Sequence, residues 1–177
     1  MAEIDKSKLQ QHNTWWIRRE LILEDPHLKE YEEQKFKWEP PFFTSDKLKT
    51  DAVLTLRGPR RVGKTTALKL LIKKFLLEDN LPPQSIFLYS CDRIEDYKEL
   101  YSLLLTYVEF ARPRLSQRLY IFLDEISFVS EWQRAIKSLI DEGKGKGITF
   151  LLTGSNILDL RVSGERLPGR RGEVFQP

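Results

Sequence analysis

The chain has 177 residues, of which 41% are apolar and 31% are charged. This length and apolar content are enough for one domain with a buried core. The 29 basic and 26 acidic residues leave a net charge of +3, which is too small to indicate nucleic-acid binding. A single cysteine, Cys91, excludes an internal disulfide and a cysteine-based metal cluster. The sequence carries neither a signal-peptide pattern nor an apolar run of membrane-spanning length, so we expect a cytoplasmic protein with no membrane segment.

Residues 1–50 differ in composition from the rest of the chain. They are rich in charged residues and tryptophan, and short helices are expected within them. Pro40 and Pro41 then prevent any helix from continuing. We interpret residues 1–50 as an amino-terminal helical extension and residues 51–177 as the core domain.

A tryptophan pair stands in this extension. Trp15 and Trp16 are adjacent in sequence, and adjacent residues of an α-helix do not share one face. We therefore expect one of them to pack on the core. The other has two interpretations: it packs on the core as well, which is favoured, or it covers an adenine base or a partner surface.

Strand and helix patterns alternate in the core domain. Short apolar runs predict four strands, at residues 52–58, 85–92, 118–125 and 147–155. Between them the apolar residues recur at helical spacing, as Leu68, Leu71 and Ile72 do. Strand–helix units of this length imply a parallel sheet with right-handed crossovers, which makes the fold class α/β.

The stretch GPRRVGKTT follows the first predicted strand and matches the pattern G-x-x-x-x-G-K-[ST]. Its two glycines, Gly58 and Gly63, let the backbone approach a triphosphate closely, and the following helix adds N–H groups and a positive dipole end. Lys64 then reaches the β and γ phosphates, and the Thr65 hydroxyl binds Mg²⁺. The alternative is a glycine-rich turn that matches by chance. The predicted nucleotide-binding residues are Gly58, Pro59, Arg60, Arg61, Val62, Gly63, Lys64, Thr65 and Thr66.

The side chains of Arg60 and Arg61 have two interpretations. Loop side chains at variable positions usually point to solvent, but both arginines lie where they would also be able to touch phosphate.

Two acids follow the third predicted strand. Asp124 at the end of this buried strand is expected to hold Mg²⁺, as a Walker-B aspartate does. Alternation along a strand places the adjacent Glu125 on the other side of the pleat, where it activates the attacking water as general base. The alternative is a strand capped by ordinary surface acids. Because no N-K-x-D stretch for guanine recognition is present, ATP is favoured over GTP.

With these motifs in place, the chain resembles the AAA+-like P-loop ATPases of archaea and bacteria in which an ATPase core precedes a winged-helix or nuclease-like domain. The matching stretches include TWWIRRE, LTLRGPRRVGKTTALKLLI, YIFLDEISFVSEWQRAIKSLID, FLLTGSN and GERLPGRRGEVFQP. The resemblance implies a three-layer sandwich with strand order 5-1-4-3-2 and ATP binding with Mg²⁺. Members of this group continue past the position of Pro177 into a helical lid, so we expect the chain either to be truncated before those parts or to be naturally short.

The resemblance also implies two further polar contacts with the γ-phosphate. Asn156, or in second place Ser155, is expected to sense the γ-phosphate or position water, although Gly-Ser-Asn also suits a strand-end turn. Arg170 and Arg171 are either γ-phosphate-sensing cations or part of a solvated basic turn. The expected catalytic residues are Glu125, Lys64, Asn156 and Arg170, and the expected metal ligands are Thr65 and Asp124.

Three functions remain open at this point. The leading one is Mg²⁺-dependent ATP binding and hydrolysis, with ATP and ADP as ligands and a homo-oligomer or partner protein completing the site. The second is a nucleotide-binding switch or fragment without appreciable turnover. The third is a DNA-associated motor module, which the small net charge supports only weakly.

Overall fold

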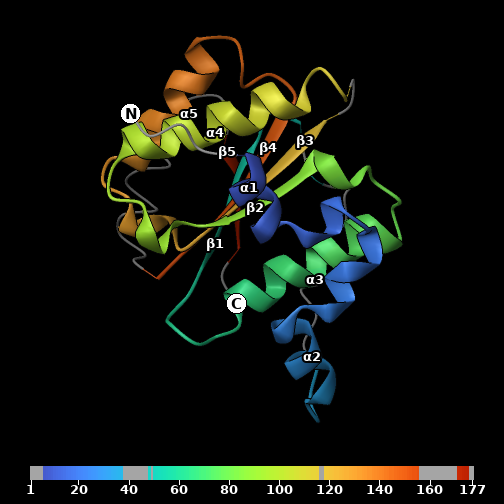
Figure 1. The fold of residues 1–177 in the computed structure, drawn as a ribbon. Helices are drawn as coiled ribbons and strands as arrows, with labels where there is room; N and C mark the ends of the chain where they lie inside the picture. Colours follow the sequence, from blue (N-terminus) through green and yellow to red (C-terminus); the bar gives the residue numbers. More distant parts are fainter. Residues whose placement is uncertain (1–5, 38–47, 49, 116–117, 156–170, 176–177) are drawn as a thin grey trace.

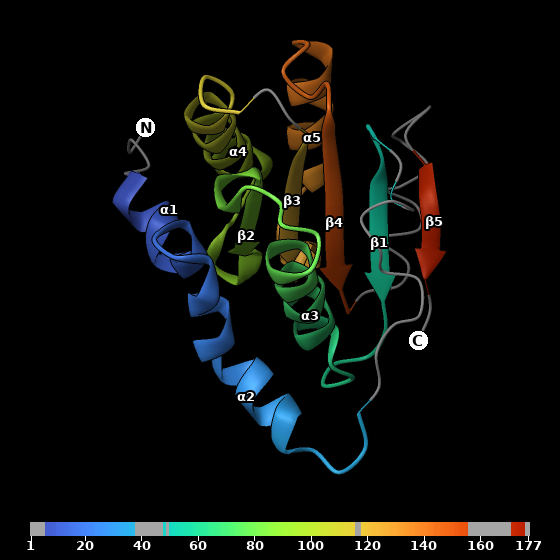
Figure 2. The same cartoon turned by 90° about the vertical axis from the view of Figure 1, so that its right-hand side faces the viewer.

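The computed structural model describes residues 6–37, 48, 50–115, 118–155 and 171–175, the last five and residues 6–8 by their backbone alone. Five strands form the described sheet: β1 (Val53–Arg57), β2 (Ile86–Ser90), β3 (Leu119–Asp124), β4 (Ile148–Gly154) and β5 (Arg171–Phe175). Their order is β2-β3-β4-β1-β5, and every neighbouring pair is parallel. Read from the β5 edge, this order is 5-1-4-3-2. The predicted α/β class is confirmed, and Figure 2 shows the strands side by side.

Helices cover both faces of this sheet (Figure 1). The longer ones are α3 (Lys64–Leu77), α4 (Tyr97–Ala111) and α5 (Trp132–Asp141). The shorter elements are α1 (Lys6–His12), α2 (Pro26–Glu33) and the 3₁₀ turns η1 (Thr14–Trp16), η2 (Arg19–Glu24), η3 (Pro83–Ser85), η4 (Cys91–Arg93) and η5 (Ile126–Phe128). Helix α3 lies on one face, and α4 and α5 lie together on the other, which gives the expected three layers.

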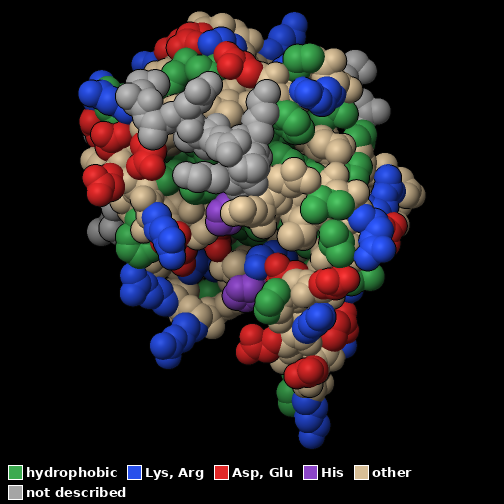
Figure 3. Space-filling model, in the orientation of Figure 1, with side chains coloured by type: hydrophobic (Ala, Val, Ile, Leu, Met, Phe, Trp, Pro, Cys, Tyr) green, Lys and Arg blue, Asp and Glu red, His purple; other side chains and the backbone are tan. Residues whose placement is uncertain are grey.

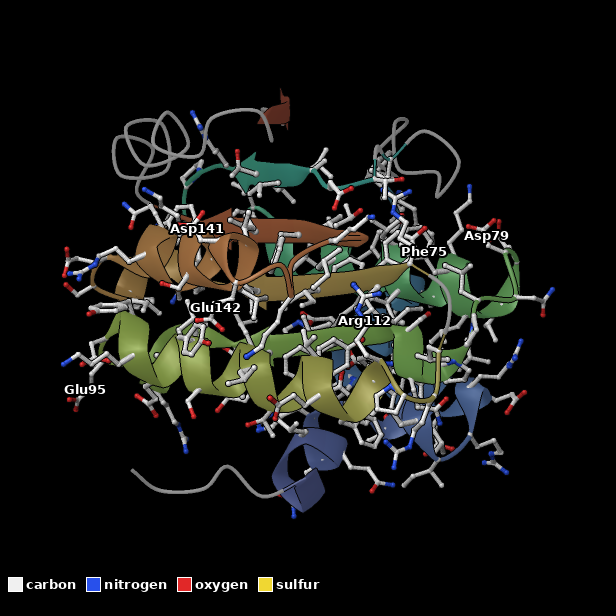
Figure 4. The ribbon with its side chains drawn as sticks, turned by 90° about the horizontal axis from the view of Figure 1, so that it is seen from above. Phe75, Asp79, Glu95, Arg112, Asp141 and Glu142 are labelled. Carbon is white, nitrogen blue, oxygen red and sulfur yellow. The ribbon has the colours of Figure 1, made fainter. Side chains whose placement is uncertain are left out.

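Apolar strands explain this layered arrangement. Every residue of β1, β3 and β4 is buried, as expected of parallel strands covered on both faces. On one face the ring of Phe75 from α3 lies 4.8 Å from that of Tyr120 on β3, and Figure 4 labels Phe75 on its helix. On the other face the ring of Tyr107 from α4 stacks 4.4 Å from that of Phe87 on β2. The observed strands lie within one or two residues of the four predicted runs.

The amino-terminal segment, residues 6–37, forms hydrogen bonds with the edge strand β2. The Asn13 amide donates to the Leu88 carbonyl at 3.1 Å and accepts from the Leu88 N–H at 2.7 Å, so it pairs with the strand as a backbone would. The indole N–H groups of Trp15 and Trp16 both donate to the Ile86 carbonyl, at 3.2 and 2.8 Å. An unpaired edge strand would otherwise offer these groups to another chain.

Both tryptophans pack in the core, so neither is left to cover an adenine base or a partner surface. Trp15 and Trp16 are both buried, because they lie in a 3₁₀ turn laid along the sheet edge rather than in an α-helix with one buried face. Trp16 also stacks on Phe110 of α4 at 5.3 Å between ring centroids. The division into an extension of residues 1–50 and a core stays a prediction.

The same segment is tied to α3, the helix that begins within the phosphate-loop motif. Arg19 donates to the carbonyl of Leu76 at 3.2 Å near the end of α3. Asp25 forms an ion pair with Lys69 at 2.8 Å, with both side chains largely buried. The amino-terminal segment therefore braces both β2 and α3.

Charges on the surface are mixed. On the face drawn in Figure 3, lysine and arginine side chains alternate with aspartate and glutamate. No helix in the described part of the chain is both long and apolar enough to cross a membrane.

Replacing Asn13 by alanine should lower the free energy of unfolding by about 1–3 kcal/mol, because the buried N–H of Leu88 loses its acceptor. Urea unfolding followed by circular dichroism measures the loss. Gln11→Ala, which removes an exposed amide from the same segment, is the matched control. Equal stability of the two variants would contradict the edge-sealing role.

Candidate nucleotide site

The loop between β1 and α3 turns through two left-handed residues. Gly63 has φ = 83° and Arg61 has φ = 66°. The left-handed region favours glycine because it lacks a Cβ. A Cβ placed on Gly63 would meet no atom within 4 Å, so the backbone conformation, not crowding, requires glycine here.

Helix α3 begins directly after this turn at Lys64. Its N-cap, Gly63, provides no side-chain hydrogen bond, and the backbone ladder begins with the Ala67 N–H bonded to the Gly63 carbonyl. The first-turn N–H groups of a helix have no partner within the helix, and they lie at its positive dipole end. The start of α3 is therefore suited to an anion such as phosphate.

The Lys64 side chain lies inside the loop, with only 5% of the residue exposed. Its ammonium donates to the carbonyls of Gly58 at 3.1 Å and Pro59 at 2.9 Å. It also lies 3.7 Å from the Glu125 carboxylate. The loop thus encloses one positive charge close to the start of α3.

Thr65 and Asp124 face each other across the site. The Thr65 hydroxyl donates to Oδ2 of Asp124 at 2.7 Å, which joins the first turn of α3 to the last residue of β3. A hydroxyl and a carboxylate are oxygen ligands of the kind that Mg²⁺ prefers. No cluster of three or more His, Cys, Asp or Glu side chains that could hold a metal occurs among the described residues. This donor set fits Mg²⁺, which is usually bound by one or two protein oxygens together with water and phosphate.

Glu125 adopts a left-handed backbone conformation, with φ = 53° and ψ = 42°. For a residue with a side chain this costs on the order of 1–3 kcal/mol, and such strain is concentrated at functional sites. Its carboxylate accepts from the Ser155 hydroxyl at 3.3 Å and faces Lys64. The expectation that Glu125 points to the other side of the pleat is wrong, because β3 ends at Asp124 and the left-handed turn brings the next carboxylate back to Lys64.

Thr153 is a site residue that the sequence interpretation missed. It lies on β4, between β1 and β3, and is completely buried. Its hydroxyl donates to Oδ1 of Asp124 and accepts from the Glu125 N–H at 2.9 Å. The signal was a polar residue inside the apolar run FLLTGSN, two positions before Ser155, the nearer of the two residues that the interpretation selected.

The other predicted site residues fall into three groups. Arg60, Arg61 and Val62 are exposed, and the guanidinium of Arg60 lies 5.6 Å from the centre of the Phe128 ring. Thr66 is half-buried in the first turn of α3. Asn156, Arg170 and the side chain of Arg171 lie outside the described residues.

Cys91 lies near the same edge of the sheet, at the start of η4. Burial raises the pKa of its thiol, and the negative charge of Asp124 raises that pKa further. Cys91 is therefore a neutral thiol at physiological pH and does not act as a nucleophile.

A separate hollow of about 740 Å³ lies at the amino-terminal ends of β3 and β4, away from the phosphate loop. Its two arginines have structural partners. Arg112, labelled in Figure 4, donates to the Lys146 carbonyl, and Arg118 donates to the Leu48 carbonyl and to Oγ1 of Thr149. These contacts tie the α5–β4 loop and the strand ends together, so we assign no nucleotide to this hollow.

Several solved structures are similar to this chain. Rhizobiales Trip13 is 13% identical and has a TM-score of 0.50, with 99% of this chain and 66% of that chain covered. A DNA polymerase III gamma subunit-related protein from Thermotoga maritima is 11% identical and has a TM-score of 0.49, with 73% of this chain and 41% of that chain covered. A katanin structure is 18% identical and has a TM-score of 0.48, with 98% of this chain and 50% of that chain covered. The chain thus spans 41% to 66% of the length of these structures.

No curated protein sequence matches the chain significantly. The family described as an AAA domain matches residues 50–175, which is more than half of the chain. This match includes the phosphate loop, both acids of the site and the whole described sheet. The chain therefore belongs to the AAA domain family, whose members are AAA+-like P-loop ATPases.

Proposed function

We propose that this chain binds ATP together with Mg²⁺ and hydrolyses it. The observation that carries the proposal is the meeting of Lys64, Thr65, Asp124 and Glu125 at one edge of the sheet. They come from the start of α3 and the end of β3, so the fold alone brings them together. An ammonium, a hydroxyl and two carboxylates are the groups that phosphoryl transfer to water requires.

Lys64 and the loop backbone would hold the phosphates. The Lys64 ammonium now donates to two neutral carbonyls of its own loop. A phosphate oxygen is a charged and therefore stronger acceptor, so the ammonium is expected to turn to the nucleotide when it binds. The free N–H groups at the start of α3 add to this binding.

Thr65 and Asp124 would hold Mg²⁺. When bound, the metal supplies positive charge that offsets the charge of the phosphate oxygens. The two side chains already lie in contact at 2.7 Å, so little rearrangement of the protein is needed.

Glu125 would act as the general base. Its side chain is 24% exposed, so water reaches it, and Ser155 and Lys64 fix its direction. As water attacks the γ-phosphorus, the Glu125 carboxylate accepts a proton from the water and the bond to the β-phosphate oxygen breaks. The products are ADP and phosphate. The roles of Asn156 and Arg170 stay predictions, as does a contribution from a second copy or a partner protein.

One observation favours the second candidate, a nucleotide-binding switch without turnover. The Glu125 carboxylate lies 3.7 Å from the Lys64 ammonium, and this ion pair directs the carboxylate at the lysine instead of at a water molecule. If this ion pair persists with nucleotide bound, the chain holds ATP without hydrolysing it.

Glu125→Gln should lower the turnover number for ATP at least 100-fold, since general-base catalysis contributes about 10²–10⁴ in rate. The affinity for ATP with Mg²⁺ should stay within about threefold, because the amide keeps the shape of the side chain. Phosphate release and binding of a fluorescent ATP analogue measure the two quantities.

Glu131→Gln is the matched control for that variant. Glu131 is an exposed glutamate that also has a left-handed backbone, with φ = 54°, and it pairs with Arg134. Its replacement should leave turnover unchanged. Unchanged turnover in Glu125→Gln would remove the role of general base, and binding without turnover in the unmodified chain would support the switch.

Lys64→Ala should weaken ATP binding about 10- to 100-fold, the loss expected for a hydrogen bond to a charged group. Isothermal titration with ATP measures the change, and thermal unfolding checks that the buried site still folds. Lys73→Ala removes a half-buried lysine of the same helix that pairs with Glu32, and this variant should bind ATP normally. Normal affinity in Lys64→Ala would contradict a nucleotide in this loop.

A further inference from the structure

We infer that Thr153 is a positioning residue that fixes both carboxylates of the site through a single hydroxyl. The inference rests on the proposed function, because it assigns to Thr153 the geometry on which Mg²⁺ binding and water activation depend. Thr153 adds β4, the strand between β1 and β3, to the elements that form the site.

The first contact fixes Asp124. Thr153 donates to Oδ1 of Asp124, and Thr65 donates to Oδ2 at 2.7 Å. The two hydroxyls hold different oxygens of the carboxylate, and one comes from β4 and the other from α3. With both oxygens held, the plane of the carboxylate cannot rotate, and the lone pairs left on Oδ2 keep one direction for a metal ion.

The second contact fixes Glu125. The Glu125 N–H donates to the same Thr153 oxygen at 2.9 Å. This N–H belongs to a residue in the left-handed conformation, which returns the Glu125 carboxylate to Lys64. Thr153 therefore stabilises the strained turn that aims the general base.

Hydroxyl chemistry explains why one residue serves both acids. A hydroxyl has one proton to donate and two lone pairs that accept. An ionised Asp124 only accepts, so the proton of Thr153 goes to it and a lone pair remains for the Glu125 N–H. Branching at Cβ restricts the rotamer of threonine, which holds the hydroxyl in this direction.

This role differs from the γ-phosphate contact expected of Asn156 or Ser155. Thr153 has 0% of its surface exposed, so water and nucleotide do not reach its hydroxyl. Ser155, two positions later, is half-buried and touches the Glu125 carboxylate directly. Thr153 thus acts only through the two acids.

Three variants separate positioning from simple packing. Thr153→Val keeps the shape of the side chain and removes the hydroxyl, whereas Thr153→Ser keeps the hydroxyl. The matched control is Thr149→Val, because Thr149 is an equally buried threonine of β4 whose hydroxyl accepts from Arg118 at 2.8 Å. Thr149 lies about 13 Å from Thr153 toward the start of the strand, at ~3.3 Å per residue.

Three quantities are measured for each variant: the turnover number for ATP, the affinity for a fluorescent ATP analogue with Mg²⁺ and with EDTA, and the midpoint of thermal unfolding. In Thr153→Val, turnover should fall at least about 30-fold, since misplaced catalytic groups cost on the order of 10²-fold. The gain in affinity from Mg²⁺ should fall at least about fivefold, and the affinity in EDTA should stay within about twofold. Thr153→Ser should restore both to within about threefold of the unmodified chain, and Thr149→Val should lower only the unfolding midpoint.

The inference is overturned if Thr153→Val keeps normal turnover and a normal Mg²⁺ gain, or loses them no more than Thr149→Val does. If Thr153→Val does not fold, Thr153→Ala takes its place in the same comparison. If the unmodified chain binds ATP without hydrolysing it, the proposed hydrolysis fails, and the Mg²⁺ gain still decides the role of Thr153. If the unmodified chain binds no nucleotide, both proposals fall.

Discussion

The hydrogen bond between Thr65 and Asp124 joins the two halves of the site. It links the first turn of α3 to the last residue of β3, although β1, which leads into α3, and β3 are not neighbours in the sheet. Strand β4 lies between them, and its Thr153 bonds to the same aspartate. Three elements far apart in sequence thus meet at one carboxylate. The loop lysine, the left-handed Glu125 and the start of α3 all take their places around this point.

The amino-terminal segment supports this arrangement from the β2 edge of the sheet and from α3. Asn13, Trp15 and Trp16 satisfy backbone groups of the edge strand β2, and Asp25 pairs with Lys69 on α3. The segment therefore contacts the helix whose first turn carries Lys64 and Thr65, and the strand next to β3. Burial of its apolar residues within the same core as the sheet explains why charged, tryptophan-rich sequence precedes a regular α/β pattern.

Much of the fold follows from local pattern. The four strands were predictable because continuous apolar runs end in glycine or acidic residues, and the phosphate loop because its glycine, lysine and threonine stand at fixed spacing. The position of β4 between β1 and β3 came from resemblance rather than from pattern, since strand order depends on long-range packing. The left-handed turn at Glu125 and the double contact of Thr153 were not predictable for the same reason. Both depend on groups about 28 positions apart in sequence that meet only in the folded sheet.

The central claim is that this site turns ATP over instead of merely holding it. The most direct measurement is a single-turnover experiment, in which excess purified chain is mixed with γ-labelled ATP and Mg²⁺ and the bound nucleotide is recovered over time. Our account predicts that the bound ATP converts to ADP and phosphate with Mg²⁺ and stays intact with EDTA. Recovery of intact bound ATP in the presence of Mg²⁺, over many hours, would contradict it and leave a nucleotide-binding module.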